Sequence, residues 1–416
     1  MVGSIGETEL ASVGVAIQIF FIHWMMLFGF TGGAATFVAQ FFGVRDFVNI
    51  RKTVGLAVFA CLSVSLPFFA CGAFFPETIV KIFTNISEVQ VLACDFVRIA
   101  SFTFLTLSIT VPLTSALRAT HQTRIPLFIS AIALCLNTFL CYVFIFGNFG
   151  APELGVAGAA LATVFARIVE LLLLLFVIFA RKNIIAGRFR DYFGWMKDFA
   201  VKIVNVAVPT MLNETLWGLG MTMYTAAYAR MGITAYASVQ ACNVLNNLFI
   251  LAAFSMGDAA LILVGQKLGA GDLEYGYALA KKLLKIGTAI GFMAGICLIM
   301  LSKPLIHFFD LTPQGQRYAF YILLIYGLTM GVALFNAINI TGILRAGGDT
   351  RFAMISETLC VGLIGVPLAF ISSMWLKLPI YLVVLLVKTE EIVKLFILLK
   401  RFMSKKWVKN VIHNIQ

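Results

Sequence analysis

Charged residues are scarce in this sequence. Asp, Glu, Lys and Arg make up only 12% of the 416 residues, whereas 61% of the residues are hydrophobic. A water-soluble domain of this length could not cover its surface with so few polar groups. Apolar stretches of roughly 20 residues, long enough to cross the hydrocarbon core of a bilayer as a helix, recur along the whole chain. We therefore predict an all-α integral membrane protein.

Residue patterns typical of enzymes are also lacking. The four histidines are scattered, and the chain has no HExxH motif, no CxxC pair and no Ser/His/Asp set. The eight cysteines lie in or beside apolar stretches, where small core residues are expected. These absences predict a protein that is not an enzyme and that uses no cofactor, and they disfavour a membrane-embedded enzyme as an alternative.

About eleven apolar stretches are predicted to span the membrane. Their approximate bounds are 10–42, 53–75, 92–116, 125–147, 155–180, 203–229, 235–266, 283–302, 318–344, 352–374 and 379–399.

A formal net charge of +12 raises the possibility of nucleic acid binding. Most of the 31 Lys and Arg residues, however, lie in every second loop and in the C-terminal tail. The positive-inside rule makes these segments cytoplasmic, and anionic lipid head groups account for the excess charge. We therefore expect a multi-pass protein of the plasma membrane (the bacterial inner membrane) with a cytoplasmic C-terminus. Its partners are the lipid bilayer and small molecules, with no nucleic acid and no obligate protein partner.

The two halves of the chain share a repeated pattern. Shifting the sequence by 226 residues lays Gln40, Gly43 and Asp46 on Gln266, Gly269 and Asp272, and a shift of 227 lays one LRA segment on the other. Both copies lie at the cytoplasmic end of a span, so the halves are parallel repeats. We predict an N-terminal lobe of five helices at 1–180, a cytoplasmic linker at 181–202 and a C-terminal lobe of six helices at 203–416.

The offset of the repeat also indicates which span has no counterpart. The second half has six predicted spans and the first half has five, and the unmatched span is the first. We expect a pattern of twelve helices minus the first, either because the start codon is misassigned or because the chain is truncated.

Several longer segments follow one another in a characteristic order: GFTGGAATFVAQFFGVRD, LRATHQTRIP, GVAGAALAT, PTMLNETLWGLG, VGQKLGAGD and LRAGGDTR. In sequence and in topology these segments resemble the multidrug and toxic compound extrusion (MATE) family. The resemblance implies two pseudo-symmetric lobes that rock around a central cavity. It also implies efflux of small organic cations or drugs, coupled to an inward flow of H⁺ or Na⁺.

The resemblance implies site residues as well. In one branch of the family an ion site lies in the N-terminal lobe, and Asn137 and Thr163 match its positions, although Cys141 stands where that branch has a carboxylate. In another branch the ion site lies in the C-terminal lobe. There Glu214 occupies the acidic position of the seventh family helix, and the tenth helix offers only Asn336 and Asn339.

Glu214 and Asp258 are the main candidates for ion coupling. At about 1.5 Å per helical residue, Glu214 lies roughly 18 Å from Lys202 at the inner boundary, and Asp258 lies roughly 14 Å from Lys267. An ionisable group so deep in lipid is costly and indicates function. Neither carboxylate has Lys or Arg within one helical turn. We predict that they bind H⁺ or Na⁺, the only metal ion expected.

Polar residues near these carboxylates are predicted to line the cavity. Gln240, Asn243 and Asn247 share a helix face with Asp258, and Asn213 precedes Glu214. The other side chains predicted to line the cavity are those of Asn336, Asn339, Asn137 and Thr163. The alternative for these side chains is hydrogen bonding between helices that holds the bundle together.

Other charged residues in the spans are predicted to be structural. We expect Glu170 to pair with Arg167, and Glu391 with Lys388, because each lies three residues away on the same helix. Arg345 is expected to cap a helix end or bind phosphate head groups.

Two alternative functions remain open from the sequence. A flippase for a lipid-linked saccharide would favour a strongly cationic cavity that binds pyrophosphate. A truncated family member that does not transport is the other alternative.

Overall fold

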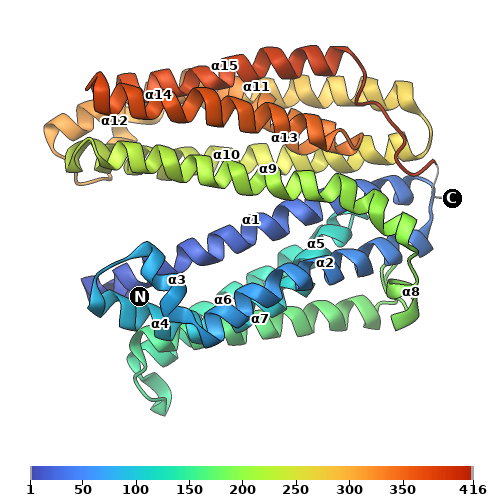
Figure 1. Cartoon of the computed structure of the whole chain (residues 1–416), viewed down its shortest axis with the longest axis horizontal. Helices are drawn as coiled ribbons and strands as arrows, with labels where there is room; N and C mark the ends of the chain where they lie inside the picture. Colours follow the sequence, from blue (N-terminus) through green and yellow to red (C-terminus); the bar gives the residue numbers. More distant parts are fainter. Residues whose placement is uncertain (1, 414–416) are drawn as a thin grey trace. The chain divides into compact units, whose positions relative to one another are not determined.

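The computed structural model describes residues 2–413 (Figure 1). This part of the chain consists of helices joined by short loops and contains no β-strand. The prediction of an all-α fold is therefore confirmed. Residue 1 and residues 414–416, which the predicted lobes include, lie outside the described residues.

The chain folds as two compact units. Unit 1 comprises Met1–Val38 and Asp46–Val204, and unit 2 comprises Ala39–Arg45 and Asn205–Gln416. The last turn of the first long helix therefore belongs to unit 2.

Unit 1 is built from helices that pack around aromatic side chains. Phe104 stacks on Phe20 and contacts the ring of His23, whose Nε2 lies 2.7 Å from Ser65 Oγ. The helices are α1 (Glu7–Gly43), α2 (Phe47–Phe74), α3 (Pro76–Phe83), α4 (Ser87–Ala100), α5 (Phe102–Ala119), α6 (Arg124–Phe146), α7 (Gly155–Ala180) and α8 (Phe189–Phe193).

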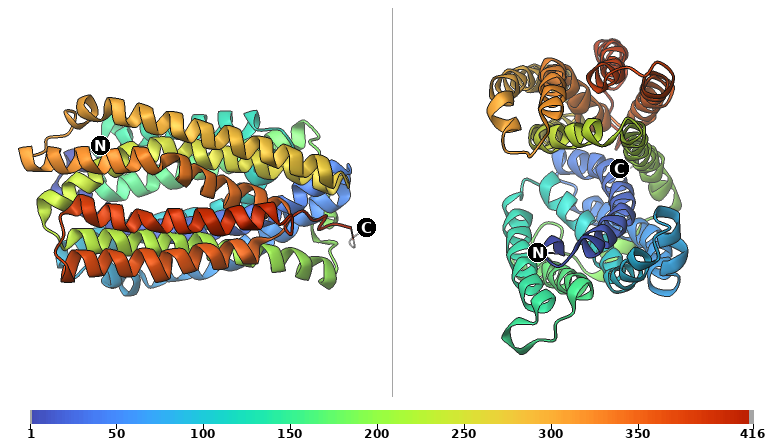
Figure 2. Two further views of the ribbon diagram at one scale, coloured as in Figure 1. Left: turned by 90° about the horizontal axis from the view of Figure 1, so that it is seen from above. Right: turned by 90° about the vertical axis from the view of Figure 1, so that its left-hand side faces the viewer.

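Unit 2 contains long helices that run side by side (Figure 2). Three π-helical segments interrupt its later helices, and such segments are frequent at functional sites. The elements are α9 (Lys197–Ala229), α10 (Ile233–Gly269), α11 (Leu273–Ile306), α12 (Pro313–Ala337), η3 (Ile338–Leu344), α13 (Thr350–Leu359), η4 (Cys360–Gly365), α14 (Val366–Phe370), η5 (Ile371–Trp375) and α15 (Ile380–Met403).

The predicted spans correspond closely to these helices. Within residues 2–413, nine helices are long and apolar enough to cross a membrane. The predicted spans 203–229 and 379–399 correspond to α9 and α15, which do not meet that criterion: α9 is less apolar, and α15 carries several charged residues. Both of these helices contribute side chains to the buried polar network described below.

One predicted span is wrong as a single helix. The stretch 92–116 is divided at Ser101, whose hydroxyl donates to the backbone oxygen of Arg98 at 2.8 Å. Serine hydroxyls compete in this way with continuous helical hydrogen bonding. The charged helix α4 is thereby separated from the apolar α5, and only α5 meets the criterion for a span.

The repeated Gln and Gly residues meet each other within unit 2. A Cβ atom added to Gly43 would collide with the backbone oxygen of Gln266, and one added to Gly269 would collide with the backbone oxygen of Gln40. Only glycine permits so close an approach of two helix backbones. The internal repeat thus corresponds to a reciprocal contact between α1 and α10.

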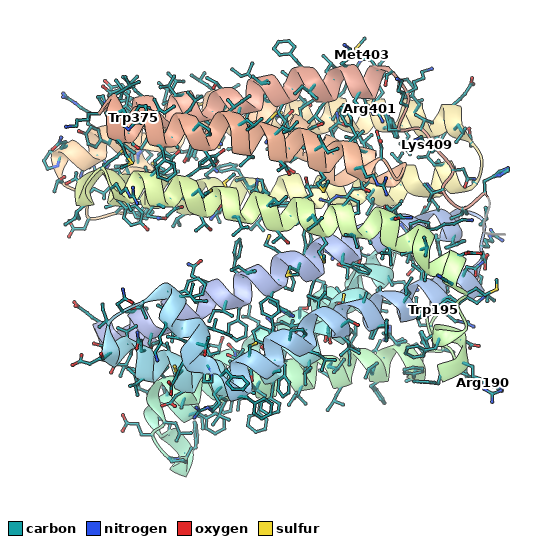
Figure 3. The ribbon with its side chains drawn as sticks, in the orientation of Figure 1. Arg190, Trp195, Trp375, Arg401, Met403 and Lys409 are labelled. Atoms are coloured by element: carbon teal, nitrogen blue, oxygen red, sulfur yellow. The ribbon has the colours of Figure 1, made fainter. Side chains whose placement is uncertain are left out.

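The C-terminal segment covers this contact. The Gln40 side chain donates to the backbone oxygen of Ala346 at 2.8 Å and accepts from the backbone N–H of Val411 at 2.8 Å. The segment lies at the end of unit 2 that carries Arg401 and Lys409, whereas Trp375 lies at the opposite end (Figure 3).

Candidate functional site

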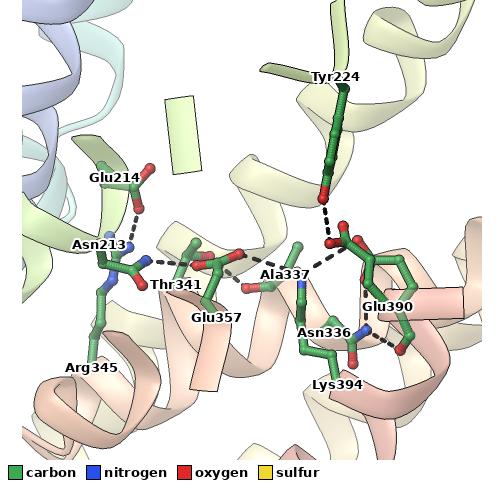
Figure 4. A network of polar contacts seen from close by, with 11 residues as sticks. Asn213, Glu214, Tyr224, Asn336, Ala337, Thr341, Arg345, Glu357, Glu390 and Lys394 are labelled. Carbon is green, nitrogen blue, oxygen red and sulfur yellow. Dashed lines mark hydrogen bonds and ion pairs between the residues drawn. The ribbon is translucent and has the colours of Figure 1, made fainter. Parts of the chain in front are cut away.

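Buried polar side chains form a network inside unit 2 (Figure 4). They come from α9, α12, η3, α13 and α15 and bring acidic, basic and amide groups together among apolar helices. Charged groups in such surroundings are stable only when they are paired or hydrogen-bonded.

The first part of the network is an ion pair between Glu214 of α9 and Arg345, which follows η3. Arg345 Nη2 donates to Glu214 Oε1, and the two side chains are 2% and 4% exposed respectively. At this burial the pair is shielded from water and salt, so the removal of either partner leaves an uncompensated charge.

Two sequence-based expectations are corrected by this pair. Glu214 has a basic partner after all, contributed by a residue 131 positions further along the chain. Arg345 neither caps an exposed helix end nor reaches the head groups, because the C-terminal segment covers that end: a Cβ atom on Gly347 would collide with the backbone oxygen of Trp407. The coupling role of Glu214 stays a prediction.

Asp258, the second predicted coupling residue, is half-buried on α10. Its neighbour Gly257 lies against η3, since a Cβ atom there would collide with the hydroxyl of Thr341. Asp258 therefore follows a residue at which α10 packs closely against η3. Its role as an ion-coupling residue also stays a prediction.

The second part of the network is centred on Lys394 of α15, which is 2% exposed. Its ammonium group lies 3.7 Å from Glu357 Oε1 and 3.5 Å from Glu391 Oε1. The other oxygen of each carboxylate accepts an amide N–H: Asn213 donates to Glu357 at 2.7 Å, and Asn336 donates to Glu391 at 2.7 Å. Both carboxylates are thus stabilised in their charged form.

The predicted pair between Glu391 and Lys388 is therefore wrong. Lys394, three residues after Glu391, is its partner, and the Lys388 ammonium lies over the ring of Tyr326 at 5.2 Å. On a helix, residues three positions before and three positions after a carboxylate are both within reach. Packing against α12 and α13 decides between them.

A third carboxylate, Glu390, lies beside this cluster but has a different partner. The Tyr224 hydroxyl of α9 donates to Glu390 Oε2 at 2.5 Å, and Glu390 is 2% exposed. Sequence reasoning missed Glu357 and Glu390. A signal for Glu390 was present, because two adjacent acids lie four and three residues before a lysine within an otherwise apolar helix.

Several amide atoms in this region have no hydrogen-bond partner among the described residues. They are the side-chain oxygens of Asn213 and Asn336 and both amide atoms of Asn339, all of them buried. A buried polar atom without a partner costs about 1–3 kcal/mol. These three predicted site residues therefore retain unused capacity for a ligand or an ion.

The remaining predicted residues of unit 2 lie elsewhere on α10. Asn243 accepts a hydrogen bond from Tyr326 of α12 at 3.0 Å, which is the bundle contact that was the alternative for the polar stripe. Gln240 is half-buried and Asn247 is exposed. Their role in lining a cavity stays a prediction.

In unit 1 the structure brings the predicted Asn137 and Thr163 together, with the amide nitrogen 3.4 Å from the hydroxyl. The predicted pair of Arg167 and Glu170 is confirmed at 2.6 Å, and Ser130 also donates to Glu170 at 2.8 Å.

Within residues 2–413, no group of three or more His, Cys, Asp or Glu side chains is arranged to hold a metal ion.

A comparison with protein families decides the class of this protein. The model of the MatE family matches residues 1–143 and 207–371. The chain belongs to the MatE family. This MatE protein is accordingly a multi-pass membrane transporter and not an enzyme, as the motifs of the sequence predicted.

Curated relatives of this MatE protein extend over nearly the whole chain. It is 26% identical over 406 residues to a probable multidrug resistance protein NorM of Thermotoga maritima, covering 97% of this chain and 86% of the relative. It is 24% identical over 382 residues to a probable multidrug resistance protein YoeA of Bacillus subtilis, covering 90% of this chain and 81% of the relative.

Solved structures show the same fold. A MOP superfamily transporter from Pyrococcus furiosus has a TM-score of 0.86 at 17% identity and covers 97% of this chain and 90% of its own. A crystal structure of MATE in the bent conformation has a TM-score of 0.87 at 16% identity, with the same coverage. These similarities confirm the predicted all-α membrane fold.

Proposed function

We propose that this MatE protein exports small organic cations or drugs by alternating access of its two halves, driven by an inward flow of H⁺ or Na⁺. Membership of the family supports transport, and the two relatives named above are described as probable multidrug resistance proteins. We further propose that the chain resides in the plasma membrane, the inner membrane of a bacterium, with its C-terminus in the cytoplasm. The basic residues of every second loop support this orientation.

Ion coupling is assigned to Glu214, together with Asp258. The buried pair of Glu214 with Arg345 is the observation that carries this assignment. A proton or Na⁺ that binds Glu214 competes directly with the guanidinium group of Arg345. Ion binding therefore favours a state in which this pair is broken, and ion release favours the state with the pair intact.

The energy of the pair is large enough for such a switch. Removing one partner of a buried ion pair costs about 3–5 kcal/mol, and about 1.4 kcal/mol changes an equilibrium tenfold. Neutralising Glu214 can therefore shift the balance of two conformations by at least two powers of ten.

Substrate contacts are assigned to the polar side chains predicted for the cavity. They are Asn213, Gln240, Asn243, Asn247, Asn336 and Asn339 in unit 2, and Asn137 and Thr163 in unit 1. Amide and hydroxyl groups can bind a cation through their oxygens without fixing its identity. The buried cations Arg345 and Lys394 each have a carboxylate partner, so we do not favour a cationic cavity for a lipid-linked saccharide.

The test is transport of a fluorescent cationic dye into proteoliposomes under separate, imposed H⁺ and Na⁺ gradients. The wild-type protein should accumulate dye under one of them. Glu214→Gln should lose this accumulation, whereas Glu274→Gln, which alters an exposed acid at the start of α11, should retain it. If Glu214→Gln inserts normally and still follows the imposed gradient, the assigned coupling site is wrong.

A further inference from the structure

The pair of Tyr224 and Glu390 differs from every other buried acid of the network. Glu357 and Glu391 each lie within 4.0 Å of the Lys394 ammonium, and Glu214 pairs with Arg345. Glu390 has no such partner: across the described part of the chain, no basic side chain lies within ion-pair distance of it, and its hydrogen-bond partner is the Tyr224 hydroxyl. A charged carboxylate held by a single hydroxyl in the bilayer is costly.

The surroundings of this pair are closed by a third element. A Cβ atom on Gly365, the last residue of the π-helical segment η4, would collide with both the Tyr224 hydroxyl and Glu390 Oε2. The glycine thus leaves just enough space for the hydroxyl and the carboxyl group to meet. The pair is enclosed by α9, η4 and α15, and Figure 4 shows the hydroxyl pointing at the carboxyl group.

The charges near Lys394 indicate that one of the neighbouring carboxyl groups carries a proton. Two carboxyl groups, those of Glu357 and Glu391, lie within 4.0 Å of the Lys394 ammonium, and Glu390 is the residue before Glu391 on the same helix. Lys394 and the two asparagine amides stabilise Glu357 and Glu391 as carboxylates. If all three were ionised, one ammonium would face three negative charges in a medium of low dielectric constant. Protonation of one acid lowers this excess of negative charge, and Glu390 is the acid with no basic side chain within ion-pair distance.

We propose that Glu390 is a proton-exchange site of this transporter: its carboxyl group holds a proton when enclosed by Tyr224 and Gly365, and releases it when the helices around it rearrange. In the protonated state the carboxyl hydrogen or the phenol hydrogen fills the hydrogen bond between the two groups. On release the proton passes to water, and the carboxylate keeps the hydrogen bond from Tyr224. This inference rests on the proposed function and names H⁺ as the coupling ion.

Titratable and charged groups of five helical elements surround Glu390. They are Tyr224 and Tyr228 of α9, Tyr326 of α12, Glu357 of α13, Cys360 of η4, and Lys388, Glu391 and Lys394 of α15. The release of a proton from Glu390 adds one negative charge one residue away from Glu391. This change increases the repulsion between carboxylates near Lys394 and favours movement of α15 relative to α9 and α13. Proton release is thereby linked to a change of conformation.

The most direct test is infrared difference spectroscopy of the purified full-length protein in lipid, titrated from low to high pH. The C=O band of a buried protonated carboxyl group should disappear as the pH rises. Glu390→Gln should lack this band, whereas Glu391→Gln should retain it. Tyr224→Phe should shift the frequency of the band, because the carboxyl group loses its hydrogen-bond partner. A Glu390 that stays ionised would show no such band, and a Glu390 that stays protonated would show a band that does not disappear as the pH rises.

Transport supplies the second readout. With one proton exchanged per substrate, a gradient of one pH unit supports about a tenfold accumulation ratio of the cationic dye. Glu390→Gln should keep dye exchange without a gradient but lose accumulation driven by a pH gradient. Gly365→Ala should weaken the same coupling, whereas Gly362→Ala, in the same η4 segment with open space around its Cβ position, should not.

The outcomes separate this inference from the proposed function. If the wild type accumulates dye under neither gradient, coupled export fails, and the infrared titration alone decides the site. The inference is overturned if Glu390→Gln keeps the titrating band, if the band is lost in Glu357→Gln or Glu391→Gln instead, or if only a Na⁺ gradient drives accumulation.

Discussion

Replacement of Lys394 by methionine tests how the buried cluster is held together. Methionine has a similar length and no charge, so the variant removes the ammonium group and little volume. Glu357 and Glu391, at 3.7 and 3.5 Å from that group, would each keep an asparagine N–H and lose their cation. Two buried negative charges would then face each other without compensation.

The expected loss is large. Breaking a buried ion pair from one side costs about 3–5 kcal/mol, and here a single change affects two carboxylates. Lys388→Met on the same helix is the matched control. Its ammonium lies over the ring of Tyr326 at 5.2 Å, an interaction worth about 0.5–2 kcal/mol. The triple variant Lys394→Met/Glu357→Gln/Glu391→Gln should recover most of the loss, because neutral replacement of a complete buried ion set is often tolerated.

The assay is the rate at which purified protein in detergent loses its monodisperse state at a fixed raised temperature, because membrane proteins of this size commonly unfold irreversibly. Lys394→Met should decay fastest, and Lys388→Met and the triple variant should stay near the wild type. The deficit of Lys394→Met should shrink as the buffer pH is lowered, since protonation neutralises the stranded carboxylates. Equal decay rates for Lys394→Met and Lys388→Met would show that Lys394 does not stabilise the protein by compensating Glu357 and Glu391.

Two further predictions concern the end of unit 2 that carries the C-terminal segment. Gly43→Ala should lower the midpoint of thermal unfolding, because its Cβ atom collides with a backbone oxygen and such overpacking costs about 1–3 kcal/mol. Gly14→Ala in the same helix meets open space and should leave the midpoint unchanged. Asp349→Asn should reduce the stability of the folded protein by about 1.5–3 kcal/mol, because it weakens the bidentate ion pair with Arg401 at 2.6 and 2.8 Å. A thermal midpoint equal to that of the wild type would contradict this prediction.

Much of the fold could be predicted from the sequence, because the bilayer imposes a simple rule on helix length and composition. Ten of the predicted spans lie, to within one residue at either end, in single helices or in helices continued by π-helical segments. The exception, 92–116, fails because hydropathy does not detect a one-residue break at Ser101. The π-helical segments were also missed, since one extra residue per turn leaves no trace in apolar composition.

The site could be predicted only in part. Depth in the membrane drew attention to Glu214, a single acid in a long apolar stretch, and the structure places it in the buried network. Its partner was missed because Arg345 is far away in sequence and lies next to a cytoplasmic loop, where basic residues are common. Spacing along a helix identifies local pairs such as Arg167 with Glu170, but it cannot detect pairs between helices.

The cluster around Lys394 shows the same limit. The sequence placed Glu391 next to a lysine in both directions, and only the packing of α15 against α12 and α13 selects Lys394. Glu390 and Tyr224 are 166 residues apart, and no local pattern joins them. The polar contacts of unit 2 therefore join residues of different helices that are far apart in the sequence.

Glu214 of unit 2 is proposed to exchange a bound cation for the substrate. The most direct measurement is the release of H⁺, followed with a pH indicator, and of radioactive Na⁺ when a cationic dye is added to the purified protein in weak buffer. The wild type should release one of these ions on dye binding, and Glu214→Gln should bind the dye and release clearly less. Full release from Glu214→Gln, or dye binding by the wild type with no release of either ion, would contradict the account.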